Sequence, residues 1–268
     1  MKRTTYIFIG IFCANIVLVL GFAFYVKSVL RITKPLTYNF DMVQNPGSVD
    51  MNDVHTLEFF ISGVDSKEYY FADPGRILLT SSGSEENCVM SYPVSDYLKL
   101  EKKDGVLSIT LDLPLPATLD SSKDGKNTRR SERIDLQGLD IRITGAKTLT
   151  KISSGTGFEV KLHRLELDSL YLNSKDCQVD SCAIRSLVLD GRRLNMRASQ
   201  CTYLSFDLDK TNWWDIKESK INTLHLTGSK HYQNRLSADQ YNRLIWEPKG
   251  DKAKLDMSLR SKSEVIMN

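Results

Sequence analysis

The sequence lacks an excess of either charge, and it lacks the short motifs of common catalytic and metal sites. Its 268 residues carry 36 Lys and Arg against 33 Asp and Glu, a net charge of +3, which is too small to favour nucleic acid as a partner. None of the four histidines stands in a His-x-His or His-Glu-x-x-His pair. There is no Gly-x-Ser-x-Gly nucleophile elbow, and Gly155-Thr156-Gly157 lacks the third glycine and the lysine of a phosphate-binding loop. We therefore expect no catalytic residues, no cofactor and no metal.

Cysteine is scarce, and its placement leaves two interpretations open. Cys13 is preceded by Gly10-Ile11-Phe12 and lacks the small residue that a lipoprotein cysteine requires just before it. The other four can form two disulfides outside a membrane, or they can be buried as small hydrophobic side chains: Cys88, Cys177, Cys182 and Cys201. Cys177 and Cys201 align with apolar positions of the pattern described below, which favours burial.

A single long apolar run is present, from Tyr6 to Val26. At 1.5 Å per residue it is about 30 Å long, the thickness of the hydrocarbon core of a bilayer. Lys2 and Arg3 precede it, and its small-x-small pattern, Gly21-Phe22-Ala23, lies inside the run where a cleavage site would not. The sequence predicts an uncleaved signal anchor over 6–26, with 1–5 cytoplasmic and the rest outside the cytoplasm. A cleaved signal is the alternative.

Apolar residues recur in the second half of the chain at a fixed long spacing. Pairs that alternate with one outward residue follow each other in steps of 17, 17, 20 and 20 residues. These are Leu170/Leu172, Leu187/Leu189, Leu204/Phe206, Leu224/Leu226 and Leu244/Trp246. A second column with the same register is Val160/Leu162, Cys177/Val179, Leu194/Met196 and Trp214/Ile216, and a third is Leu167, Ile184, Cys201, Ile221 and Tyr241. Alternation of period 2 excludes an all-α chain.

Three columns with one shared period are typical of stacked coils. The predicted fold class is all-β: a single-stranded, β-helix-like β-solenoid, with turn residues such as Asp190-Gly191 and Thr227-Gly228 at its corners. The change of step from 17 to 20 indicates an insertion at one corner, around Asp209 to Trp214.

The rest of the chain completes the predicted organisation. Residues 27–50 are expected to be a juxtamembrane linker, and 51–268 the ectodomain. Within it, 51–119 form an N-terminal β region with short strands around 57–61, 69–71 and 77–79. A hairpin turns at Asp104-Gly105, because both residues tolerate positive φ. Residues 120–135 are a charged insertion, a solvated loop or a binding loop for an anionic polymer, and 136–268 are the stacked coils.

A resemblance follows from the order of these features. An apolar segment precedes Val54 to Gly63, the hairpin strand Asp104 to Ile109 follows, and Thr148 to Val160 leads into the stacked coils. This order resembles the GIN domain, the head-domain family named for auto-transporter adhesins, in envelope proteins of Bacteroides-type bacteria, over about residues 51–245. The charged insertion and the changed step near Trp213 depart from it. The resemblance implies a β-solenoid in the cell envelope and suggests adhesion, and it carries over no catalytic residues.

Exposed aromatic residues are the candidate binding face. Tyr171, Tyr203, Trp213 and Tyr232 fall on outward or loop positions of adjacent coils, where aromatic faces can bind sugar rings or proteins, unless they only cover their neighbours. Across successive coils, Asp168 and Asp176 are expected to pair with Arg185 and Arg193.

The predicted function is a non-enzymatic binding, adhesion or scaffold module. It would be held in the bacterial cell membrane by one span, with its ectodomain in the periplasmic or extracytoplasmic space and a glycan or envelope protein as partner. The alternative is a carbohydrate-active β-helix lyase or hydrolase, for which Asp190 and Asp207 are the aligned carboxylates. A sensor that couples ligand binding to the membrane helix is a third class. Oligomeric state is left open.

Overall fold

A computed structural model describes residues 15–22, 35–42, 44, 46–63, 69–81, 87–115, 132–234, 241–257 and 264–267. The chain separates into two units, 1–36 and 37–268. In the first unit, residues 15–22 form a helix. Within the described ranges, no helix combines the length and the apolar character needed to cross a membrane. The remainder of the predicted span, 6–14 and 23–26, lies outside those ranges.

The second unit is all-β in its described parts, as predicted, and its first strand begins one residue before it, at Leu36. Its first ten strands are β1 (Leu36–Asn39), β2 (Pro46–Asp50), β3 (Thr56–Ser62), β4 (Tyr69–Asp73), β5 (Gly75–Thr80), β6 (Val89–Pro93), β7 (Leu98–Lys103), β8 (Val106–Asp112), β9 (Glu132–Gln137) and β10 (Asp140–Thr144). The others are β11 (Lys151–His163), β12 (Glu166–Asp180), β13 (Ala183–Asp190), β14 (Arg193–Arg197), β15 (Gln200–Asp207), β16 (Trp213–Lys217), β17 (Lys220–Gly228), β18 (His231–Asn234), β19 (Tyr241–Pro248), β20 (Lys254–Met257) and β21 (Glu264–Met267).

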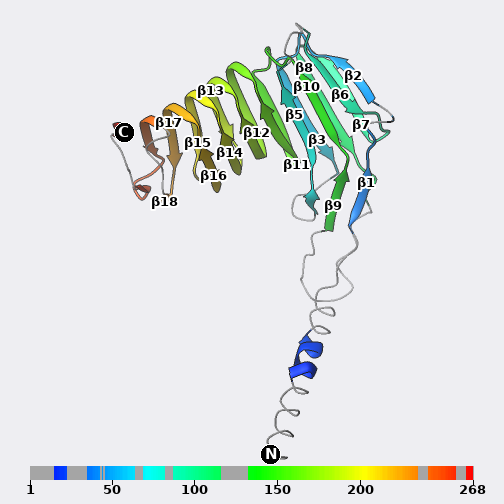
Figure 1. The fold of residues 1–268 in the computed structure, drawn as a ribbon, viewed down its shortest axis with the longest axis horizontal. Helices are drawn as coiled ribbons and strands as arrows, with labels where there is room; N and C mark the ends of the chain where they lie inside the picture. Colours follow the sequence, from blue (N-terminus) through cyan, green and yellow to red (C-terminus); the bar gives the residue numbers. More distant parts are fainter. Residues whose placement is uncertain are drawn as a thin grey trace, which may run out of the picture. The chain divides into compact units, whose positions relative to one another are not determined.

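Pairing sorts most of these strands into two parallel columns, which share the long strands β11 and β12 (Figure 1). Column 1 runs β8, β3, β11, β12, β13, β15, β17, β19, β21. Column 2 runs β10, β5, β11, β12, β14, β16. Antiparallel strands close one end: β7 pairs β8, while β6 pairs β10 and β2 pairs β6. The N-terminal strands therefore continue into the stack without a break.

The predicted register is confirmed. Successive pairing joins Leu170, Leu187, Leu204, Leu224 and Leu244 in column 1, and all five are buried. The second and third predicted columns are paired as expected too. We call the segments 166–182, 183–199, 200–219, 220–240 and 241–257 repeats 1 to 5. The core lies between the two columns, because the strands of both columns bury most of their alternate residues there.

Four successive corners, from the one before repeat 1 to the one that ends repeat 3, are each built by a residue in the left-handed backbone region. Arg164, Ser181, Ala198 and Glu218 have φ of 54°, 56°, 48° and 51°. The next residue is buried, and from repeat to repeat its side chain accepts a backbone N–H: Ser199 Oγ accepts from Cys182 at 3.1 Å, and Ser219 Oγ accepts from Ser199 at 3.1 Å. Each corner is thus hydrogen-bonded to the next, which satisfies backbone groups that a sharp turn would leave buried without partners.

The change of step is placed where predicted, at the opposite corner. Three residues separate Leu189 from Arg193, whereas six separate their pairing partners Phe206 and Trp213. The longer connection is fixed from both sides. Thr211 N donates to Asp207 O at 2.8 Å, and Thr211 Oγ1 donates to Gly191 O at 2.8 Å. The insertion therefore adds to the surface without disturbing the core.

Three segments can be compared with the predicted linker, charged insertion and hairpin. Strands β1 and β2 lie within 27–50, where a linker was expected, because their sequences are too short to show alternation. Residues 132–135 belong to β9 and not to a solvated insertion, since Arg133 holds the buried Asp135 at 2.9 Å. Residues 120–131 lie outside the described ranges. The hairpin at Asp104-Gly105 is confirmed, with φ of 51° and 74°.

The four described cysteines are buried and free: Cys88, Cys177, Cys182 and Cys201. Burial raises the pKa of the Cys88 and Cys201 thiols to about 11. All four are buried as small hydrophobic side chains, the interpretation that the alignment of Cys177 and Cys201 favoured, and none forms a disulfide.

Candidate functional site: a polar network and a groove across the repeats

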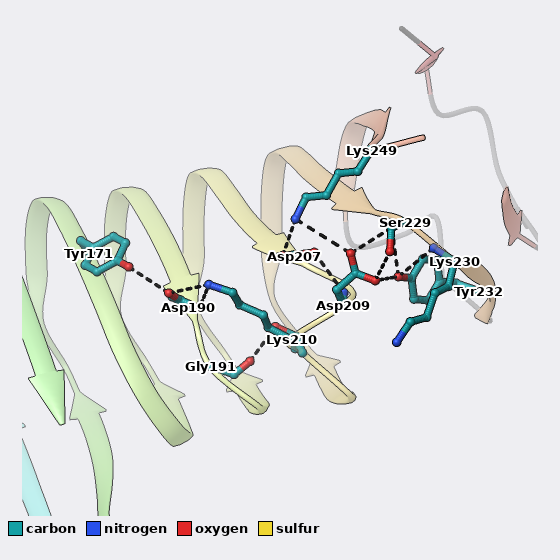
Figure 2. A network of polar contacts seen from close by, with 11 residues as sticks. Tyr171, Asp190, Gly191, Asp207, Asp209, Lys210, Ser229, Lys230, Tyr232 and Lys249 are labelled. Carbon is teal, nitrogen blue, oxygen red and sulfur yellow. Dashed lines mark hydrogen bonds and ion pairs between the residues drawn. The ribbon is translucent and has the colours of Figure 1, made fainter. Parts of the chain in front are cut away.

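Tyr171, a predicted binding residue, is held by the repeat that follows it. Its hydroxyl donates to Asp190 Oδ2 at 3.1 Å, and Lys210 Nζ lies 2.9 Å from the same carboxylate (Figure 2). Partial burial, followed by the nearby Asp190 charge, raises the pKa of Tyr171. The ring therefore belongs to a chain of contacts that joins three successive repeats.

Tyr232 has a structural role at the far end of this network. Its hydroxyl accepts the backbone N–H groups of Ser229 and Lys230, each at 3.2 Å, and donates to Asp209 (Figure 2). The hydrogen bond from Tyr232 lowers the pKa of Asp209. The ring covers Gly228, where a Cβ would lie 2.6 Å from it. Tyr232 therefore fixes the turn before β18, and its hydroxyl is fully used.

Tyr203 belongs to a second group of contacts on the outer side of column 1. Its hydroxyl lies 2.6 Å from Nδ1 of His225, and Nε2 of His225 lies 3.0 Å from Glu247 Oε2. Ser205 Oγ is 3.5 Å from the same Nδ1. The hydroxyl–imidazole–carboxylate order is that of a nucleophile activated by a base. However, Tyr203 occupies the nitrogen that Ser205 would need, so the group serves better as a clamp between repeats.

Trp213 is the one predicted binding residue with a largely free ring. It begins β16 and is 48% exposed. It lies on column 2, whereas Tyr171 and Tyr203 lie on column 1. The four aromatic residues thus do not form one continuous face. Each of the three tyrosines has an acidic or histidine partner in the adjoining repeat: Asp190 for Tyr171, His225 for Tyr203 and Asp209 for Tyr232. The sequence contained these partners, but the prediction did not use them.

The two carboxylates of the enzymatic alternative are also engaged. Asp190 contacts Lys210, and Asp207 contacts Lys249 (Figure 2). The Asp190 carboxylate raises the pKa of Lys210. A glycosidase requires two carboxyl groups that face one another across an open site. Here each carboxylate faces a lysine.

A groove crosses all five repeats where the column 1 strands begin. It has a volume of about 920 Å³ and is open to solvent. Its lining is Glu166, Leu167, Asp168, Ala183, Ile184, Arg185, Gln200, Cys201, Thr202, Lys220, Ile221, Asn222 and Asn242. No aromatic side chain is among them, so the groove is a different place from the predicted aromatic face.

The groove follows a bend that recurs in β12, β13, β15, β17 and β19 of column 1. Alternation breaks because two consecutive residues, such as Asp168 and Ser169, face outward between the buried Leu167 and Leu170. The pairing register omits Asp168 and the equivalent position of each later repeat. The bend aligns outward side chains of successive repeats along one line, about 4.8 Å apart.

Part of the polar lining of the groove is available to a ligand, whereas most side chains of this line pair with one another. Gln200, Thr202 and Lys220 are exposed and make no side-chain hydrogen bond with the described residues. Asn242 Nδ2 donates to Asn222 Oδ1 at 3.0 Å. The predicted pair of Asp168 and Arg185 is present at the first two repeats, at 2.7 Å, and Asp176 lies 3.5 Å from Arg193 on column 2.

Comparison with known proteins gives weak likenesses. No family model matches, and no curated protein matches, so the resemblance to the GIN domain stays a prediction. Among solved structures, a "putative adhesin" of Bacteroides fragilis is 13% identical, with a TM-score of 0.36, and the match covers 86% of this chain and 99% of that one. A "putative lipid binding protein" of Parabacteroides distasonis is 8% identical, with a TM-score of 0.32 and coverage of 87% and 99%. A "putative adhesin" of Parabacteroides merdae is 9% identical, with a TM-score of 0.30 and coverage of 87% and 97%.

Proposed function

We propose that this protein is a non-enzymatic binding module of the bacterial cell envelope. In this proposal, residues 51–268 form a β-solenoid ectodomain, and residues 6–26 anchor it in the membrane by one span. The apolar run of 6–26 has the length that a bilayer requires. The shared period of the columns is that of a solenoid.

The groove across the repeats carries the binding proposal. A site of about 920 Å³ lined by exposed amides and a hydroxyl presents hydrogen-bonding groups at regular intervals. Such a surface suits a repetitive polymer better than a compact metabolite, because open, elongated sites bury little of a small ligand. The aromatic residues support the site indirectly, since Tyr171 and Tyr203 hold adjacent repeats together.

Blocking the groove tests the binding role. We expect the full-length chain to bind saturably to at least one isolated envelope polymer, and Thr202→Trp to abolish that binding by filling the centre of the groove. Asn195→Trp is the matched control, since Asn195 faces outward on β14 in column 2. Equal binding by both variants would remove the groove from the function.

Product analysis separates this proposal from the enzymatic alternative. The bound polymer is expected to keep its length after long incubation. Shortened products that disappear with Asp190→Asn or Asp207→Asn would identify a carbohydrate-active enzyme instead.

A further inference from the structure

The groove has the chemistry of a site for an uncharged chain. Its two acidic side chains, Glu166 and Asp168, are balanced by Arg185 and Lys220. Asp168 and Arg185 also neutralise each other directly, at 2.7 Å. Nucleic acids and acidic polysaccharides depend on an excess of basic side chains, which the groove does not supply. The central positions, Gln200, Thr202 and Asn222, are neutral and offer both donors and acceptors.

The spacing of the groove favours sugars over peptide. Equivalent side chains recur about every 4.8 Å, whereas an extended peptide rises about 3.3 Å per residue. A peptide would therefore match the repeats with only every third residue, since three residues advance by about 9.9 Å and two repeats by about 9.6 Å. One pyranose ring in an extended β-linked chain advances by a distance close to the repeat spacing. Peptide addition also needs an unpaired strand edge, and the strands beneath repeats 2 to 4 of the groove are paired on both sides.

The floor of the groove also suits the apolar faces of sugar rings. Leu167, Ile184 and Ile221 contribute apolar edges between the polar positions. Pyranose rings present C–H faces as well as hydroxyl groups, so a floor with apolar edges and a polar rim complements both.

We propose that the groove binds one chain of a neutral, β-linked polysaccharide, which lies along the stack with about one sugar per repeat. The inference rests on the proposed binding function and names its ligand. Five repeats provide four intervals, about 19 Å in all, so the site holds a chain of about five sugars. Because the groove lacks aromatic stacking, each sugar contributes little, and affinity accumulates with chain length.

The test is a titration with neutral β-linked oligosaccharides of glucose, mannose and N-acetylglucosamine, from disaccharide to octasaccharide. The full-length chain is used, in mild detergent because of its apolar run. Affinity for one of these series is expected to rise with length and to level off at about five sugars. It should change little with salt, since no net charge is neutralised.

Matched variants locate the binding. Gln200→Ala combined with Asn222→Ala should weaken binding about tenfold or more, because two hydrogen bonds are lost. Asn195→Ala, on the outer side of column 2, should leave it unchanged. Unaltered thermal unfolding of the double variant shows that the loss is not a folding defect, and Thr202→Ser, which keeps the hydroxyl, serves as a conservative second variant that retains binding.

The outcomes separate the ligand class from the binding role. If no neutral series binds, but an extended peptide or an acidic polymer binds and Thr202→Trp prevents it, the polysaccharide proposal is wrong and the binding function stands. If oligosaccharides bind equally well to the double variant, the groove is not their site. If no polymer shows binding that depends on Thr202, both proposals fail.

Discussion

Leu187 and Val188 are neighbours in β13 that lie in opposite environments. Leu187 is 0% exposed, and Val188 is partly exposed on the outer side. We expect Leu187→Asp to destabilise the protein by several kcal/mol or to prevent folding, because a buried carboxylate without a partner is costly. Val188→Asp should cost less than about 1 kcal/mol. Urea unfolding of both variants measures this, and equal losses would contradict the register.

Cys177 gives stability a dependence on alkaline pH. Burial raises the pKa of its thiol far above the ordinary value of 9.0. Because the pKa of the Cys177 thiol is raised by folding, its contribution to stability is complete at pH values below the pKa of the same thiol in the unfolded chain. It is then lost as pH rises toward the pKa of the folded protein. The loss is about 1.4 kcal/mol per pH unit for one thiol.

The expected result for Cys177 is a difference between two slopes. The free energy of unfolding of the unchanged protein should fall more steeply above about pH 9 than that of Cys177→Ala, by the contribution of one thiol. Other buried thiols and tyrosines titrate in both proteins and cancel in the comparison. Parallel slopes would show that the Cys177 thiol ionises as readily in the folded protein as in the unfolded chain.

At the scale of the element, the corner at Ala198 is strained. A residue other than glycine in the left-handed region costs about 1 kcal/mol or more, and Ala198 has φ of 48°. We expect Ala198→Gly to stabilise the protein by several tenths to about 1 kcal/mol. Ala183→Gly is the control, since Ala183 is exposed in β13 and the change there should destabilise by about 0.5–1 kcal/mol. Thermal unfolding distinguishes them, and a shift of the same sign in both would be the contrary result.

The elements also show which features a sequence of this kind reveals. The columns were predictable because alternation and a common step both report on burial. The left-handed corners were not, because Arg164, Ser181, Ala198 and Glu218 are not the glycine or asparagine that usually signals positive φ. The polar network could not be predicted, because its contacts join residues about one repeat apart in the sequence. Whether two such residues meet depends on the direction in which each side chain points. The groove left one trace: Leu167 and Leu170 are three residues apart, an odd spacing that a straight strand cannot bury on one side.

At the scale of the whole molecule, the decisive measurement is topology. We expect residues 6–26 to be an uncleaved anchor and residues 27–268 to lie outside the cytoplasm. Alkaline phosphatase fused after Asn268 should therefore be active in cells. Sequencing of the mature amino terminus is the control for cleavage: a chain that begins near residues 24–30 would contradict the anchor, and an inactive fusion would contradict the orientation.

The sharing of β11 and β12 between the columns also bears on how the molecule opens. Among the described strands, each repeat pairs only with its neighbours, and antiparallel strands close the end where the N-terminal strands lie, whereas β21 pairs on one side with β19. The free energy of local opening is therefore lowest at β21, and opening advances from there one repeat at a time. Amide hydrogen exchange should be fastest in β21 and slow progressively toward β11. A polymer bound across the repeats would have to be released before any one of them opens. Its binding should therefore also slow amide exchange in strands that it does not touch.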